Sequence, residues 1–241
     1  MKNTISFQKG NVRMVAHRGV SGLEKENTNA AFIVAANRSY FGIETDVHLT
    51  SDGKFVIIHD DDTNRVGGVD LSVEGSDYDT LRNLTLLPME GRTSRSDIRI
   101  PNMEEYFDIC SNYDKYSVFE LKNHMPEEKV VEIVEKIREL GWLDHTIFIS
   151  FDFENLTYVR KHYPDQACQY LIMDVFPDDL IDNLAKYHFA LDVEYHLLNE
   201  ERVKALKEKD ILINCWTVND PKDGEMLAKM GVDFITTNIL E

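Results

Sequence analysis

The chain has 241 residues, of which 43% are apolar, and its 43 Asp and Glu outweigh 26 Lys and Arg to give a net charge of −17. This charge argues against nucleic-acid binding, which needs a basic surface, and against docking on anionic lipid. The length and apolar content predict one globular domain over residues 1–241, long enough to form a single α/β barrel.

The cysteines are few and widely spaced, at Cys110, Cys168 and Cys215, with no C-x-x-C pair. An odd, sparse set predicts a reducing compartment, no disulfide framework and no zinc–thiolate site. The N-terminal sequence lacks the apolar run of a signal peptide, and no stretch approaches the ~18 uninterrupted apolar residues of a membrane span. We therefore expect a cytoplasmic protein without stable membrane insertion, in an oligomeric state that the sequence leaves open.

The first predicted elements are a strand and a helix. The apolar run within residues 12–17 indicates a strand, and it closes on His17. Asn27 or Thr28 then provides the N-cap of a helix that runs to about Asn37. His17 is thus expected where a buried strand emerges from the core, which is where α/β barrels place their chemistry.

Two strands follow, near 43–49 and 54–59, with only the turn 50–53 between them. This connection is too short for a crossover helix, so the two segments are either a hairpin or include one added strand. The next segment, 60–100, is polar and weakly periodic. We interpret it as a small insertion that passes over one end of a barrel rather than as a second domain.

From about residue 116 onward, short apolar runs alternate with amphipathic helical patterns. One helix, for example, opens at Pro126 with acids in its first turn and stops at Gly141. The strand candidates here are 116–121, 146–150, 167–172, 189–193, 211–216 and 231–237. The alternation predicts a TIM-type (β/α)8 barrel, an α/β fold with a parallel sheet inside a ring of helices. The whole chain offers nine strand candidates, one more than a closed eight-stranded barrel requires.

Three carboxylates are expected at the carboxyl ends of strands. Glu44 and Asp46 share one face of their strand because they are two residues apart, and Glu120 ends a later strand. Crowded carboxylates resist joint ionisation unless a cation is present. Oxygen-only ligation favours Mg²⁺, Ca²⁺ or Mn²⁺ over zinc. For any single acid a surface ion pair or a turn cap is the better interpretation, whereas the set at matching positions favours a metal.

Two histidines, His17 and His59, each follow an apolar run near these acids. Two imidazoles can divide the acid and base roles of a reaction near neutral pH. Arg18 offers a bidentate fork for a phosphate oxygen, and Lys122 adds a point charge. His48 shares strand parity with the acids and is expected only to support them from behind.

Three further residues are weaker candidates. Trp216 ends a strand, where it either walls the pocket and packs on substrate or simply covers the barrel end. Glu194 also ends a strand and either binds hydroxyls or pairs with a nearby base. His124, just past Lys122, lies in a polar stretch, where a solvated histidine is the better interpretation.

In their order, these motifs resemble the glycerophosphodiester phosphodiesterase family, which is related to phosphatidylinositol-specific phospholipase C-like phosphodiesterases. The match covers nearly the whole chain, and its N-terminal motifs are the most specific. The matching segments are His17-Arg18-Gly19, Glu26-Asn27-Thr28, 44–53, 59–63, Glu120-Leu121-Lys122, Ser150-Phe151, 216–219 and 233–238. The insertion at 60–100 follows the family pattern poorly. The helix-side residues after 150 are generic, so the preferred head group is not readable.

The resemblance implies metal-dependent hydrolysis of glycerophosphodiesters to sn-glycerol 3-phosphate and an alcohol, with Mg²⁺ or Ca²⁺ as the cofactor. It implies that His17 and His59 are the acid/base pair. Glu44, Asp46 and Glu120 are then the metal ligands, and Arg18 and Lys122 bind the phosphate. The partner is then a small-molecule glycerophosphodiester. Two alternatives stay open: a lysophospholipase D-type lipid phosphodiesterase, which needs an apolar rim, and a non-catalytic ligand-binding barrel.

Overall fold

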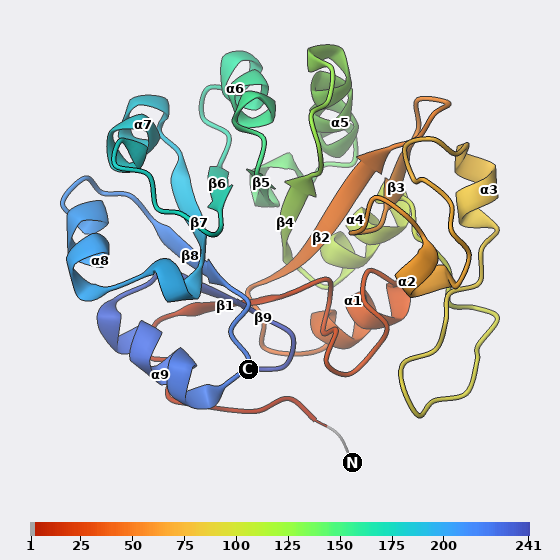
Figure 1. Ribbon diagram of the computed structural model, residues 1–241, viewed down its shortest axis with the longest axis horizontal. Helices are drawn as coiled ribbons and strands as arrows, with labels where there is room; N and C mark the ends of the chain where they lie inside the picture. Colours follow the sequence, from red (N-terminus) through yellow and green to blue (C-terminus); the bar gives the residue numbers. More distant parts are fainter. Residues whose placement is uncertain (1–2) are drawn as a thin grey trace.

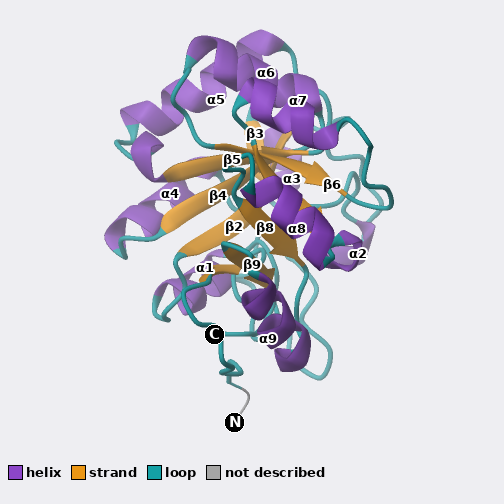
Figure 2. Ribbon diagram, turned by 90° about the vertical axis from the view of Figure 1, so that its left-hand side faces the viewer, coloured by secondary structure: helices purple, strands orange, loops and turns teal. Residues whose placement is uncertain are grey.

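The computed structural model describes residues 3–241, which form a closed barrel of parallel strands with helices around it (Figures 1 and 2). The ring closes because β1 pairs on one side with β2 and on the other with β9, the last strand. The strands of the ring are β1 (Arg13–Ala16), β2 (Gly42–Leu49), β4 (Tyr116–Leu121), β5 (Thr146–Ser150), β6 (Cys168–Ile172), β7 (Ala190–Glu194), β8 (Ile213–Trp216) and β9 (Phe234–Thr237). The predicted TIM-type (β/α)8 fold is confirmed.

The ninth strand candidate is a hairpin arm. β3 (Phe55–Ile57) runs antiparallel to β2, with Val47 paired to Ile57, and lies at the end of the strand order. The tight turn between β2 and β3 leaves no room for a crossover helix, so β3 folds back on the outside of the ring. β4 instead takes the place beside β2 in the barrel.

The longer helices cover the outside of the barrel and follow the strands in the expected alternation (Figure 2). In α5 the buried residues are Val130, Ile133, Val134 and Ile137, one face of a helix with acids in its first turn and bases in its last. The longer helices are α1 (Asn29–Ala36), α4 (Met103–Asn112), α5 (Glu127–Glu139), α6 (Phe153–His162), α7 (Leu180–Tyr187), α8 (Glu200–Lys207) and α9 (Pro221–Met230). The single-turn 3₁₀ helices are η1 (Leu143–His145) and η2 (Tyr195–Leu197). No helix within residues 3–241 combines the length and apolarity needed to cross a bilayer.

The insertion predicted near 60–100 lies between β3 and α4. It contains two short helices, α2 (Asn64–Gly67) and α3 (Tyr78–Arg82), and it packs around a small apolar cluster of its own beside β3. A separate apolar cluster inside the ring includes Val15, Val118 and Ile149. This inner cluster fills the barrel below the carboxyl ends of the strands, so the polar residues above it have a packed floor.

Candidate active site

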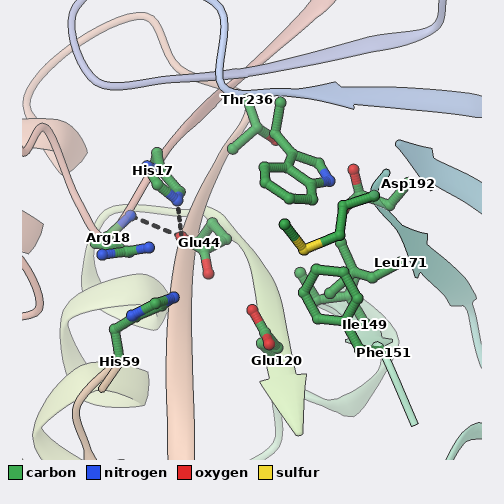
Figure 3. Close-up of a pocket in the computed structure, with 12 residues that line it drawn as sticks. His17, Arg18, Glu44, His59, Glu120, Ile149, Phe151, Leu171, Asp192 and Thr236 are labelled. Atoms are coloured by element: carbon green, nitrogen blue, oxygen red, sulfur yellow. Dashed lines mark hydrogen bonds and ion pairs between the residues drawn. The ribbon is translucent and has the colours of Figure 1, made fainter. Parts of the chain in front are cut away.

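The carboxyl ends of the strands surround a cavity of about 280 Å³ (Figure 3). Its two sides differ in chemistry. The histidines and Arg18 lie on one side, apolar side chains and Asp192 lie on the other, and Glu44 and Glu120 lie between them. In a (β/α)8 barrel this end of the sheet is where active sites form, because the βα loops there bring side chains from several strands together.

The three predicted metal-binding carboxylates lie together. Asp46 of β2 pairs in register with Glu120 of β4, and Glu44 is two residues before Asp46 on the same face. One oxygen from each lies within 4.8 Å of the others, and all three side chains are buried. Their gathering follows from the direct contact of β2 and β4, which the hairpin position of β3 allows.

The charges of this cluster fit a cation. Burial and the neighbouring charge of Asp46 raise the pKa of Glu44 well above its usual range, and the same causes raise that of Glu120 to about 8. Although burial opposes it, Arg18 and Lys122 hold the pKa of Asp46 well below its usual range. Within residues 3–241, Asp46 Oδ1 is buried and has no hydrogen-bond partner. Three oxygen donors and one orphaned acceptor are a donor set for a hard divalent ion, which would let all three carboxylates ionise together.

The two predicted phosphate-binding cations flank the carboxylates. Arg18 has a left-handed backbone with φ of 52°, and its N–H donates to Glu44 Oε2 at 2.7 Å. Its guanidinium donates to Glu26 Oε1 at 2.9 Å, while Nε is buried and has no hydrogen-bond partner in the described chain. Lys122 Nζ lies 2.8 Å from Glu120 Oε1, behind the cavity rather than in its wall. Positive charge is therefore built in where an otherwise acidic protein needs it to receive an anion.

Asn27 holds a carboxylate of the site, a role that the sequence did not predict. Thr28, rather than Asn27, caps α1, through a side chain that accepts from Ala31 N. Asn27 is buried and donates from Nδ2 to Asp46 Oδ2 at 2.7 Å, while its Oδ1 accepts from Thr45 at 2.8 Å. Asn27 thus fixes the carboxylate of Asp46 from the side opposite to its orphaned oxygen.

His17 lines the cavity, and its two nitrogens have different surroundings. Nδ1 lies 2.7 Å from Asn238 Oδ1, and this oxygen also accepts from Ser21. An amide oxygen only accepts, so Nδ1 carries the proton and the lone pair is on Nε2, 4.0 Å from Glu44 Oε2. Burial and the charge of Arg18 lower the pKa of His17 to about 4. His17 is therefore a neutral imidazole at pH 7, with its lone pair beside the carboxylates.

His59 lines the same cavity from the hairpin end but has a charged partner. Its Nδ1 lies 2.7 Å from Asp60 Oδ1, and Arg65 holds the other oxygen of Asp60 at 2.6 Å. Burial lowers the pKa of His59, and the carboxylate of Asp60 opposes this. His48 is fully buried behind it, with Nε2 3.2 Å from the carbonyl oxygen of His59. His48 therefore contacts the backbone of His59 and the side chain of Glu74, not the carboxylates that it was expected to support.

The opposite wall of the cavity is apolar and includes Trp216. Its indole packs edge-on against Phe151, with ring centroids 5.8 Å apart. Ile149, Leu171 and Met173 complete this wall. The sequence left open whether Trp216 lines the pocket or only covers the end of the barrel. In the structure it lines the pocket.

Two weaker candidates lie outside the cavity. Glu194 bonds to the exposed His196, with 2.6 Å between Oε1 and Nδ1. Of the two expectations for Glu194, the structure thus shows the contact with a nearby basic side chain. His124 lies in an exposed group with Asp152 and Glu154. Neither residue contributes to the wall of the pocket.

Sequence reasoning missed Asp192 and Thr236, which also line the cavity. Both are buried, and both have the strand parity that points into the barrel. The sequence did contain a signal for Asp192, since it lies two residues before Glu194 on β7 and shares its face. Alternation along a strand thus marked the position, but no motif distinguished it.

Fold and site together define a (β/α)8-barrel enzyme with its chemistry at the carboxyl ends of the strands. The model of the glycerophosphoryl diester phosphodiesterase family matches residues 17–241. Human glycerophosphodiester phosphodiesterase 1 is 30% identical over 95% of this chain and 79% of its own. The glycerophosphodiester phosphodiesterase of Caldanaerobacter subterraneus is 29% identical, with 93% of each chain covered.

Solved structures agree with these matches. A glycerophosphodiester phosphodiesterase from Parabacteroides distasonis superposes with a TM-score of 0.80 and 28% identity, covering 96% of this chain and 94% of its own. A phosphodiesterase from Oleispira antarctica, solved with the product sn-glycerol-3-phosphate, gives a TM-score of 0.83 at 24% identity. The match covers 94% of this chain and 92% of that one. The chain therefore belongs to the glycerophosphoryl diester phosphodiesterase family, and it is an enzyme of that class, a phosphoric diester hydrolase.

Proposed function

We propose that the chain, acting as one domain over residues 1–241, hydrolyses glycerophosphodiesters to sn-glycerol 3-phosphate and an alcohol with the help of a divalent metal. The observation that carries this proposal is that His17, His59, Glu44 and Glu120 line one cavity, with the buried Asp46 grouped beside the two glutamates. The named activity of the relatives and the product bound to the Oleispira enzyme support the same substrate class.

Glu44, Asp46 and Glu120 would hold the metal. Oxygen-only donors favour Mg²⁺ or Ca²⁺. Once bound, the ion would neutralise charge on the phosphoryl oxygens as it builds up in the transition state. Arg18 would bind a phosphoryl oxygen through its guanidinium, whose Nε has no hydrogen-bond partner in the described chain and lies 3.7 Å from Asp46 Oδ2. Lys122 would add positive charge from behind Glu120.

The partners of the two histidines suggest which is the base and which is the acid. His17, neutral and bonded to an amide, is suited to accept a proton on Nε2 from the attacking oxygen of water or of a glycerol hydroxyl. His59 has the carboxylate of Asp60 on Nδ1, which favours its charged form, and the incoming phosphate anion adds further negative charge beside it. His59 would therefore protonate the departing alcohol.

The proposal is tested by incubating the purified protein with glycerophosphocholine or glycerophosphoethanolamine and measuring glycerol 3-phosphate. Chelation of divalent ions should abolish release, and addition of Mg²⁺ or Ca²⁺ should restore it. His17→Ala and His59→Ala should each lower kcat by about 10²- to 10⁴-fold, the usual contribution of a general acid or base. His196→Ala, at an exposed histidine outside the cavity, is the matched control. Normal turnover by either active-site variant would refute the assigned roles, and binding without turnover by the wild type would refute the reaction.

A second candidate, hydrolysis of lysophospholipids, is favoured by the apolar rim of the cavity. Phe151 and Met173 line the pocket yet are 39% and 48% exposed, and the neighbouring Val175 is 65% exposed. These side chains follow β5 and β6, and Phe151 lies across the cavity from His59, the residue before the insertion at 60–100 (Figure 3). Exposed apolar groups beside a site can bind an acyl chain. A Phe151→Ser and Met173→Ser double variant should then lose turnover of lysophosphatidylcholine while retaining that of glycerophosphocholine.

A further inference from the structure

The apolar wall of the cavity contains one acidic side chain within the described residues, Asp192 of β7. It is 1% exposed, and its Oδ1 has no hydrogen-bond partner anywhere in residues 3–241. Its in-register neighbours are Leu171 on β6 and Asn214 on β8. A buried polar atom without a partner is unfavourable, so an acid at an apolar wall requires an explanation.

The polar layer next to Asp192 does not need it. Asn214 donates from Nδ2 to Gln169 Oε1 at 3.0 Å, and its Oδ1 accepts from Thr236 at 3.1 Å. These two hydrogen bonds link β6, β8 and β9 without involving Asp192. Asp192 therefore remains free to bind a group that enters the cavity.

A second orphaned polar atom belongs to the same wall. Trp216, on the neighbouring strand β8, has a buried Nε1 with no hydrogen-bond partner in the part of the chain that the structure describes. Indole Nε1 can only donate, whereas a carboxyl oxygen accepts. Burial raises the pKa of Asp192 well above its usual range.

These two atoms select the chemistry of their ligand. A hydroxyl group can accept from the Trp216 indole and donate to the Asp192 carboxyl at the same time. A quaternary ammonium group has nothing to offer the indole N–H. A phosphate oxygen has no proton to give Asp192 and finds its positive charge across the cavity, at Arg18.

Depth within the cavity indicates which part of the substrate brings the hydroxyl. Asp192, Leu171 and Ile149 are all 3% exposed or less, whereas Phe151 and Met173 at the mouth are 39% and 48% exposed. The small glycerol unit, common to every glycerophosphodiester, suits the enclosed floor. The variable alcohol suits the mouth, where its length is not restricted.

We propose that Asp192, together with Trp216 Nε1, binds a hydroxyl of the glycerol unit and so selects polyol phosphates over those lacking hydroxyls. Asp192 is here a specificity-determining residue that transfers no proton to the reacting centre. This inference rests on the proposed function, because it assigns one end of the substrate to the floor of that site.

The test compares the binding of sn-glycerol 3-phosphate and of n-propyl phosphate, which has the same carbon chain without hydroxyls. Isothermal titration calorimetry in the presence of Mg²⁺ would measure both ligands with the wild type, Asp192→Leu and Asp192→Asn. We expect the wild type to prefer glycerol 3-phosphate by about 10- to 100-fold, since propyl phosphate leaves the buried polar pair unsatisfied. Asp192→Leu should reduce this preference to about threefold or less and bind propyl phosphate at least as well as the wild type. Asp192→Asn, which keeps an oxygen acceptor, should retain most of the preference.

The inference is overturned if Asp192→Leu keeps the wild-type preference, or if it weakens both ligands equally, as a structural role would require. Turnover of glycerophosphocholine by the wild type is measured in parallel. If the wild type does not turn over glycerophosphocholine but still prefers glycerol 3-phosphate, the proposed reaction is refuted and the hydroxyl site is not. If the wild type turns over glycerophosphocholine but Asp192→Leu keeps the wild-type binding preference, the hydroxyl site is refuted and the reaction is not.

Discussion

Replacing Asn238 by aspartate should convert a neutral partner of His17 into a charged one and so reveal whether His17 is the base. The substitution keeps an oxygen 2.7 Å from Nδ1 and 2.8 Å from the Ser21 hydroxyl, so both hydrogen bonds can persist. A carboxylate at this distance favours the imidazolium form by about 1–2 pH units at a partly exposed position. The pKa of His17 should then rise from about 4 toward 5 or 6.

The readout is the pH profile of kcat/KM with glycerophosphocholine, which reports the groups that titrate in the free enzyme. A base works only when it is unprotonated, so activity falls as the pH drops through its pKa. At pH 8 the two enzymes should be equally active, because His17 is unprotonated in both. At pH 5 Asn238→Asp should be about 2- to 10-fold less active than the wild type, because a larger share of its His17 is protonated.

The matched control is Asp60→Asn, which removes the charged partner of His59 instead. The pKa of His59 should fall in this variant, so the alkaline limb of the profile should move to lower pH while the acidic limb stays in place. If Asn238→Asp leaves the acidic limb unchanged, or if it moves the alkaline one, then His17 is not the base and the reasoning from its amide partner fails.

Two further predictions concern stability. Burial alone would raise the pKa of Glu26, but its two arginine partners hold it at about 2, below the usual value of about 4.5. The ion pairs therefore stabilise the fold above about pH 4.5 and lose their effect as the pH falls toward 2. Glu26→Gln should therefore be less stable by about 2–3 kcal/mol at pH 7 in urea unfolding, and a deficit that did not shrink between pH 5 and pH 3 would contradict this account. Tyr106 is fully buried, and its hydroxyl donates to Ile43 O at 2.7 Å and also lies within hydrogen-bond distance of the Ser117 hydroxyl, at 2.9 Å. Tyr106→Phe should cost about 1–2 kcal/mol in the same assay with kcat unchanged, and equal stability would show that these bonds contribute nothing net.

Much of the fold and the polar half of the site could be predicted because both depend on local pattern. Apolar runs that end in a polar residue located His17, His59 and Glu120 at strand ends, and two-residue spacing placed Glu44 beside Asp46. Parallel strands bring their carboxyl ends to one side, so residues far apart in sequence were expected to meet. The structure places His17, His59, Glu44 and Glu120 around one cavity, with Asp46 grouped beside the two glutamates.

Other features depend on contacts that no local pattern contains. Sequence reasoning overlooked α4, although Asn102 and Glu105 form a capping box and the buried Met103, Tyr106 and Cys110 follow a helical period. The polar, weakly periodic segment before it concealed where that helix begins. For β3, only the pairing of β2 with β4 decides between a hairpin and a barrel strand. Asp192 stands out only once its neighbours are known to leave it unpartnered, which is a property of the closed barrel.

The hydrogen bond between His17 and Asn238 joins the first strand of the chain to the last. The residue after β1 depends on the residue after β9 for its orientation, and the backbone N–H of His17 also bonds to Thr237 O at 2.8 Å. A folding intermediate that has formed β1 to β8 would already hold the carboxylates, yet its base would be free to rotate. The appearance of hydrolysis during refolding would therefore report the final closure of the ring, and a spectroscopic probe of helix formation should become native-like before activity does.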